Sequence, residues 1–154
     1  MKCSFTLLLL IVSLSAFSQN RSNYLKFRDE VFHPICGWRD SLSAAEVTAE
    51  MRAVDTTLIR KNIEAYYTDL SIVESQWYAY SGDTSTLRSA ANHAVAALYH
   101  DPVNASGLWG AAFNFQRLGE CDKTNYFLKL YEERVPERYR SNTEQIALLK
   151  KRCL

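Results

Sequence analysis

Apolar side chains recur from Leu58 to Tyr80 at alternating intervals of four and three residues. They are Ile59, Ile63, Tyr66, Leu70, Val73, Trp77 and Tyr80. This spacing places them on one face of an α-helix for about six turns. Tyr67 and Tyr78 widen the apolar face on one side. The pattern therefore predicts a central helix with neighbours on more than one flank.

Shorter helical patterns lie on both sides of this segment. Ser43 and Glu46 form a capping box, which predicts a helix that starts at Ser43 and ends near Ala53. Alanines crowd the segment 87–99, and their small side chains allow another helix to approach closely. Further helices are expected over residues 104–118, 121–135 and 141–152. The chain is therefore predicted to be all-α.

The segment from Asp101 to Pro136 contains two of these helical patterns, and it resembles a tetratricopeptide repeat. Pro102 and Pro136 lie 34 residues apart, the period of this helix–turn–helix unit. With Gly119 at the turn, the other matching positions are Leu108, Ala112 and Phe115. Thr124 and Tyr131 depart from the pattern, because the family usually has alanine there. A looser copy runs from about Asp69 to Pro102, with matches at Ser75, Tyr78, Gly82, Ala90, Ala94 and Ala97.

The resemblance covers residues 69–136 and implies antiparallel helical hairpins stacked as a short solenoid. The last helix, with Ile146 and Leu149 on one side, would be the C-terminal cap of the stack. Two repeats are normally too few to be stable alone, so the cap and the N-terminal helices must complete the core. The rival interpretation is an unrelated helical bundle whose proline spacing is coincidental.

In the tetratricopeptide family the first helix of each repeat lines a concave groove. The resemblance places Trp109, Phe113, Gln116 and Arg117 there in the later copy, and Asp69, Ile72, Gln76 and Tyr80 in the earlier one. Aromatic residues and arginine are typical of binding surfaces. We therefore expect a peptide or protein partner. Two alternatives remain open: Trp109 and Phe113 pack under the N-terminal segment, or the chain is a structural, homo-oligomeric subunit.

The first 18 residues have the pattern of a secretory signal peptide. Lys2 is followed by a mostly apolar run from Phe5 to Leu14 and a small-x-small site at Ala16 to Ser18. The run is too short for a membrane span, which needs about 20 residues. We expect cleavage near Ser18 and a secreted or periplasmic product with no stable membrane span, the alternative being an uncleaved anchor. The predicted organisation is 1–18 signal peptide, 19–43 irregular segment and 44–154 helical domain.

Loss of Lys2 leaves 17 basic and 17 acidic residues. Such a neutral chain has no long-range attraction for nucleic acid or for an anionic membrane. We therefore expect no nucleic-acid partner.

Three cysteines remain after cleavage: Cys36, Cys121 and Cys153. Disulfides persist in an oxidising compartment, and an odd count allows only one intramolecular bridge. If the helices alternate in direction, Cys121 and Cys153 lie at the same end of the stack. The sequence therefore predicts a disulfide between Cys121 and Cys153.

No residue pattern predicts a catalytic, metal or cofactor site. His93 and His100 are seven residues apart, whereas helical metal ligands are typically four apart, so we interpret them as solvent-facing or capping residues. His33 and Cys36 lack a third orienting group, which leaves a Cys–His enzyme as a remote alternative. We expect a non-catalytic protein without a cofactor.

Overall fold

The computed structural model describes residues 41–59, 62–140 and 143–153, and these residues form helices and turns without a β-strand. The α-helices are α3 (Ser41–Arg52), α4 (Ile63–Ser81), α5 (Thr84–His100), α6 (Ala105–Arg117), α7 (Cys121–Arg134) and α8 (Thr143–Lys151). Short 3-10 helices are η2 (Thr56–Leu58) and η4 (Glu137–Tyr139). The predicted all-α fold is confirmed. The predicted signal peptide and residues 19–40 lie outside the described residues.

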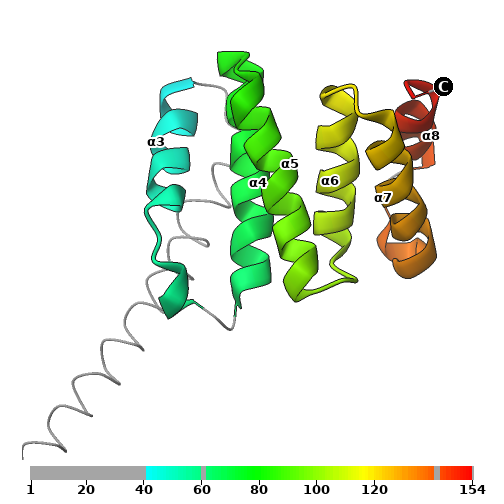
Figure 1. Cartoon of the computed structure of the whole chain (residues 1–154), viewed down its shortest axis with the longest axis horizontal. Coiled ribbons are helices and arrows are strands. Elements are labelled where there is room, and N and C mark those ends of the chain that lie inside the picture. Colours follow the sequence, from blue (N-terminus) through cyan, green and yellow to red (C-terminus); the bar gives the residue numbers. More distant parts are fainter. Residues whose placement is uncertain (1–40, 60–61, 141–142, 154) are drawn as a thin grey trace, which may run out of the picture.

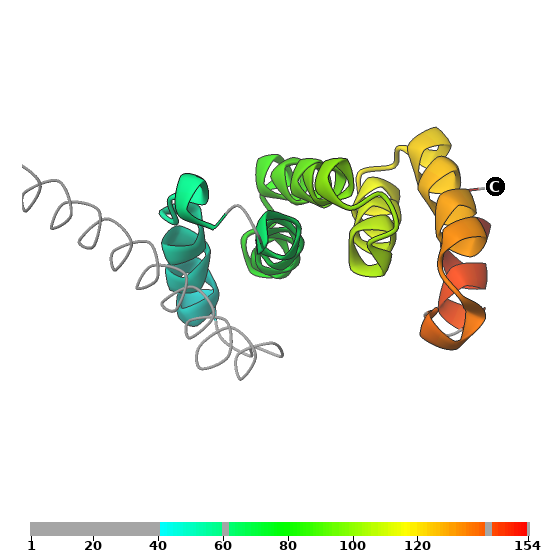
Figure 2. The ribbon, with the colours of Figure 1, turned by 90° about the horizontal axis from the view of Figure 1, so that it is seen from below.

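The α-helices lie side by side in chain order (Figure 1). Seen from below, they alternate between two layers, with α4 and α6 in one layer and α5 in the other (Figure 2). The helix α5 therefore contacts both α4 and α6, and α4 and α6 also contact each other. The arrangement is a stack of helical hairpins, with α3 packed against α4 and α8 packed against α7.

Glycines make the sharp bends between the paired helices. Gly82 has a φ of +66° at the C-terminus of α4, and Gly119 has a φ of +75° between α6 and α7. Residues with a Cβ rarely adopt this left-handed conformation. Asp83 caps α5 and Asn104 caps α6, because their side chains accept hydrogen bonds from the backbone N–H groups of Ser85 and Gly107.

Two helix starts differ from the prediction. The helix α3 already includes Ser43, so this residue is not the N-cap and the helical region begins before residue 44. The helix α4 begins at Ile63 instead of Leu58. The Asp55 side chain accepts hydrogen bonds from the backbone N–H and hydroxyl of Thr57, and this local pairing favours the separate turn η2.

The core consists of clusters between neighbouring helices. The first joins α3 to η2 and α4 through Val47, Met51, Ile59, Tyr66, Leu70 and Val73. Another joins α6 to α7 and α8 through Leu108, Ala112, Leu128, Tyr131, Val135, Ile146 and Leu149. Between these two clusters, small side chains fill the contact of α4, α5 and α6. A Cβ added to Gly110 would lie 3.5 Å from the Ala94 Cβ and 3.6 Å from the Ser71 Oγ. These short separations bring α4, α5 and α6 close together.

The predicted disulfide between Cys121 and Cys153 is confirmed. Their Cα atoms are 5.1 Å apart, although the residues are separated by 32 positions in the sequence. The bridge joins the first residue of α7 to the end of α8. It is reinforced by an ion pair of 2.8 Å between the Lys150 Nζ and a carboxylate oxygen of Glu132.

We predict that Cys121→Ser with Cys153→Ser lowers the free energy of unfolding by about 3–4 kcal/mol, because the disulfide restricts the unfolded chain. Urea unfolding followed by circular dichroism measures the change. Reduced wild-type protein is the control and should match the double variant. An unchanged unfolding midpoint would contradict the prediction.

Candidate binding groove

A groove of about 370 Å³ runs along the line where α4 and α6 meet. Its lining residues are Ser71, Ile72, Ser75 and Gln76 of α4, Ala105, Ser106, Trp109, Gly110, Phe113 and Asn114 of α6, Tyr131 of α7 and Tyr139 of η4. None of these side chains is charged at neutral pH. The described lining therefore suits an uncharged, partly apolar ligand.

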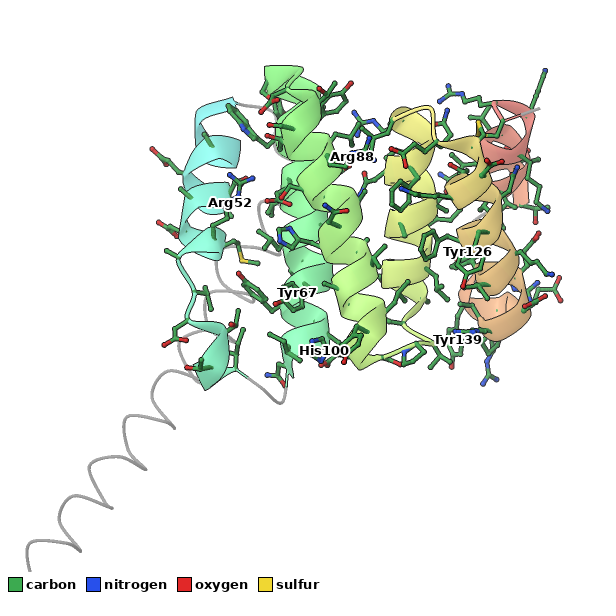
Figure 3. All side chains as sticks on the ribbon, viewed as in Figure 1. Arg52, Tyr67, Arg88, His100, Tyr126 and Tyr139 are labelled. Atoms are coloured by element: carbon green, nitrogen blue, oxygen red, sulfur yellow. A yellow bond between two sulfur atoms is a disulfide. The ribbon has the colours of Figure 1, made fainter. Side chains whose placement is uncertain are left out.

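Aromatic rings dominate one part of the groove. The Trp109 and Tyr131 ring centroids are 5.5 Å apart with the planes tilted by 49°. Tyr131 is almost completely buried, so its ring fixes the position of the Trp109 indole. Tyr139 is 63% exposed at the lower end of the stack (Figure 3), where its ring forms a rim of the groove.

The polar atoms of the groove are incompletely paired. Asn114 is only 1% exposed, and its Nδ2 donates a hydrogen bond of 3.3 Å to the Ser71 Oγ. The Asn114 Oδ1 and the Gln76 Oε1 are both buried without a hydrogen-bond partner among the described residues. A buried polar atom without a partner costs about 1–3 kcal/mol.

Of the predicted binding residues, Trp109, Phe113 and Gln76 line the groove, as does Ile72. Gln116, Arg117 and Tyr80 are not part of its lining, so their role in binding stays a prediction. Asp69 is 2% exposed and does not line it either. The alternative in which Trp109 and Phe113 pack under residues 19–43 concerns a segment that lies largely outside the described residues.

Arg117 is used to join helices. Its Nη1 donates hydrogen bonds to the carbonyl oxygen and the hydroxyl of Ser75, at 3.2 and 3.1 Å. Its guanidinium lies 4.6 Å from the centroid of the Tyr78 ring and 5.5 Å from that of Phe113. Burial lowers the pKa of Arg117 from its ordinary value. The side chain therefore links α6 to α4 from outside the groove lining.

Asn114, Tyr131 and Tyr139 line the groove but were not predicted from the sequence. The sequence contains a signal for Asn114, because it is a polar residue between two apolar ones, Phe113 and Phe115. The sequence signal for Tyr131 is that it replaces a small residue of the tetratricopeptide pattern, and in the structure its ring packs on Trp109. The sequence contains no signal for Tyr139, because its position depends on how the chain turns after α7.

A buried carboxylate lies outside the groove, where α3, α4 and α5 meet. The Glu74 side chain is completely buried, and its Oε1 accepts hydrogen bonds from the Arg52 Nη2 at 2.7 Å and the Ser89 Oγ at 3.1 Å. Its Oε2 lies 2.7 Å from the His93 Nδ1. Arg52 extends from α3 toward α4 (Figure 3). A single carboxylate thus connects three helices.

The interpretation of His93 as a solvent-facing or capping residue is wrong. It is bonded to Glu74 and its ring stacks on Tyr67, with the centroids 5.8 Å apart. His100, at the end of α5, is exposed. Burial alone would raise the pKa of Glu74, but hydrogen bonds and charges from His93 and Arg52 outweigh it and lower the pKa from its ordinary value.

No family model, curated protein or solved structure matches this chain. Across the described ranges, no helix has the length and apolar character needed to cross a membrane. The same residues place no three His, Cys, Asp or Glu side chains together as metal ligands. The His33 and Cys36 pair lies outside the described residues.

We predict that Glu74→Gln lowers the free energy of unfolding at pH 7 by about 2 kcal/mol, since a hydrogen bond to a charged group contributes about 1.5–3 kcal/mol and Arg52 is half exposed. Because the folded-state pKa of Glu74 lies below its ordinary value of 4.5, its contribution is complete above that value. It is lost as the pH falls through the lowered folded-state pKa.

Urea unfolding at pH 7, 5, 4 and 3 measures this contribution. The loss of stability below pH 4.5 should be smaller in Glu74→Gln than in the wild type. Glu133→Gln is the matched control, because Glu133 is 54% exposed and its loss should change stability by less than about 0.5 kcal/mol. Identical pH profiles for the wild type and Glu74→Gln would contradict the prediction.

Proposed function

We propose that the chain is an exported, non-catalytic helical scaffold that binds a segment of another protein in the groove between α4 and α6. The observation that carries the proposal is the groove itself, about 370 Å³, with an aromatic and uncharged lining. Pockets of this size and character are the usual places where proteins bind ligands. The rings of Trp109, Phe113 and Tyr139 would contact the partner's apolar side chains.

A tetratricopeptide-like identity is part of this proposal. The stack of antiparallel hairpins supports it, as do the bends at Gly82 and Gly119. The positions that resemble the family pattern, Leu108, Ala112 and Phe115, are also buried between helices. In such a stack the first helices of successive hairpins share one face, and α4 and α6 do so here.

Export is supported by the signal-peptide pattern of the first 18 residues. The disulfide between Cys121 and Cys153 also favours it, because such bridges are typical of oxidising compartments. Together the two observations support a secreted or periplasmic location.

A homo-oligomeric scaffold is the second candidate. Exposed apolar side chains outside the groove favour it: Tyr99 is 86% exposed, Val103 59% and Tyr126 58%. Exposed large apolar side chains can be buried in protein interfaces. In that case these side chains would be buried between copies of the chain.

We predict that a photo-crosslinking amino acid at position 139, on the rim of the groove, captures the binding partner, whereas the same residue at the highly exposed position 99 does not. With the captured partner, Phe113→Ala and Tyr139→Ala should each raise the dissociation constant about tenfold, because aromatic contacts dominate such interfaces. Isothermal titration calorimetry measures the affinity.

Tyr99→Ala is the matched control and should leave the affinity unchanged. Sedimentation equilibrium of the free protein distinguishes the second candidate. Crosslinks from position 139 only to further copies of this chain, together with a stable oligomer, would contradict binding of a different protein.

A further inference from the structure

We propose that the groove recognises the main chain of an uncharged, extended peptide, whose N–H groups donate to the Gln76 Oε1 and the Asn114 Oδ1. The inference rests on the proposed function and specifies its ligand. Gln76 belongs to α4 and Asn114 to α6, so the two helices that form the groove each contribute one acceptor.

The unpaired oxygens are the first argument. Buried polar groups in folded proteins are almost always hydrogen-bonded, and exceptions require an explanation. Three such side-chain atoms are found in the described part of the chain: the Gln76 Oε1, the Asn114 Oδ1 and the Gln116 Oε1. Two of the three belong to the groove lining. A ligand that brings donors would satisfy both.

The orientation of Asn114 is the second argument. Its Nδ2 already donates to the Ser71 Oγ, which leaves the carbonyl oxygen as the atom still to be paired. The unmet requirement in the groove is therefore for donors. The backbone N–H groups of a peptide are donors of this kind.

The charge of the lining is the third argument. A lysine or arginine side chain would also supply donors, but it would be buried against a lining that has no carboxylate. Arg117 lies outside the lining and is bonded to Ser75. Main-chain amides provide one neutral donor at each residue except proline. The peptide's apolar side chains remain available to Trp109 and Phe113.

Both oxygens are buried in the free protein, so a peptide reaches them only after a local side-chain rotation. Gln76 is half-buried at the edge of the groove and can turn toward it. We therefore expect binding to change the rotamers of Gln76 and Asn114 while the helices stay in place.

The test uses the mature protein and an array of random heptapeptides with acetylated and amidated ends. Neutral peptides with apolar side chains should be selected. In the tightest binder, N-methylation of single backbone amides should weaken binding about three- to tenfold at one or two positions, as expected for the loss of a neutral hydrogen bond. Replacing any Asn or Gln side chain of the peptide with Met should have little effect.

Gln76→Met removes the acceptor with little change of shape. It should weaken binding about three- to tenfold without lowering the melting temperature, because the unpaired oxygen is also removed. Gln116→Met is the matched control: it removes the third unpaired oxygen, which lies outside the lining, and should leave the affinity unchanged. Circular dichroism melting verifies that both variants fold.

Unchanged affinity on Gln76→Met and throughout the N-methylation series would overturn the inference. If Phe113→Ala and Tyr139→Ala still weakened binding of the same peptide about tenfold, the proposed function would stand and only the recognition by Gln76 and Asn114 would fail. Selection of charged peptides, or binding to a glycan array in place of peptides, would also overturn the inference. If no peptide binds, the inference and the proposed function both fail.

Discussion

The close approach of α4, α5 and α6 determines the rest of this structure. At Gly110 of α6 an added Cβ would lie in van der Waals contact with Ala94 of α5 and Ser71 of α4, at 3.5 and 3.6 Å. Because α6 approaches so closely, it contacts both helices of the preceding hairpin. The same contact brings Asn114 to Ser71 and defines one side of the groove. Small side chains in the core therefore control the geometry of a surface feature.

Two polar contacts add specificity to this packing. Glu74 connects α3, α4 and α5, whereas Arg117 connects α6 to Ser75 of α4. Apolar stripes tolerate small sliding movements of one helix along another, but a buried charge with several fixed partners does not. The two side chains thus fix the relative position of the helices on either side of the groove. A binding surface that is shared by different helices keeps its shape only if the relative position of those helices is fixed.

Local sequence patterns were sufficient for the helices, the glycine bends, the disulfide and part of the groove. These features depend on neighbours within a few turns or on the alternating direction of the helices. The roles of Arg117 and His93 were not predictable in this way, because their partners Ser75 and Glu74 lie 42 and 19 residues away. Periodicity shows which face of a helix is apolar. It does not show which polar residue another helix will bring to that face.

The disulfide has a mechanical consequence. Tension applied at the C-terminus passes from Cys153 directly to Cys121, so the chain between them carries no load. That shielded loop contains Tyr131 and Tyr139, which line the groove, and the exposed Tyr139 forms its rim. A protein anchored or pulled through its C-terminus would therefore keep this rim intact under force, while the strain fell on the helices that precede Cys121.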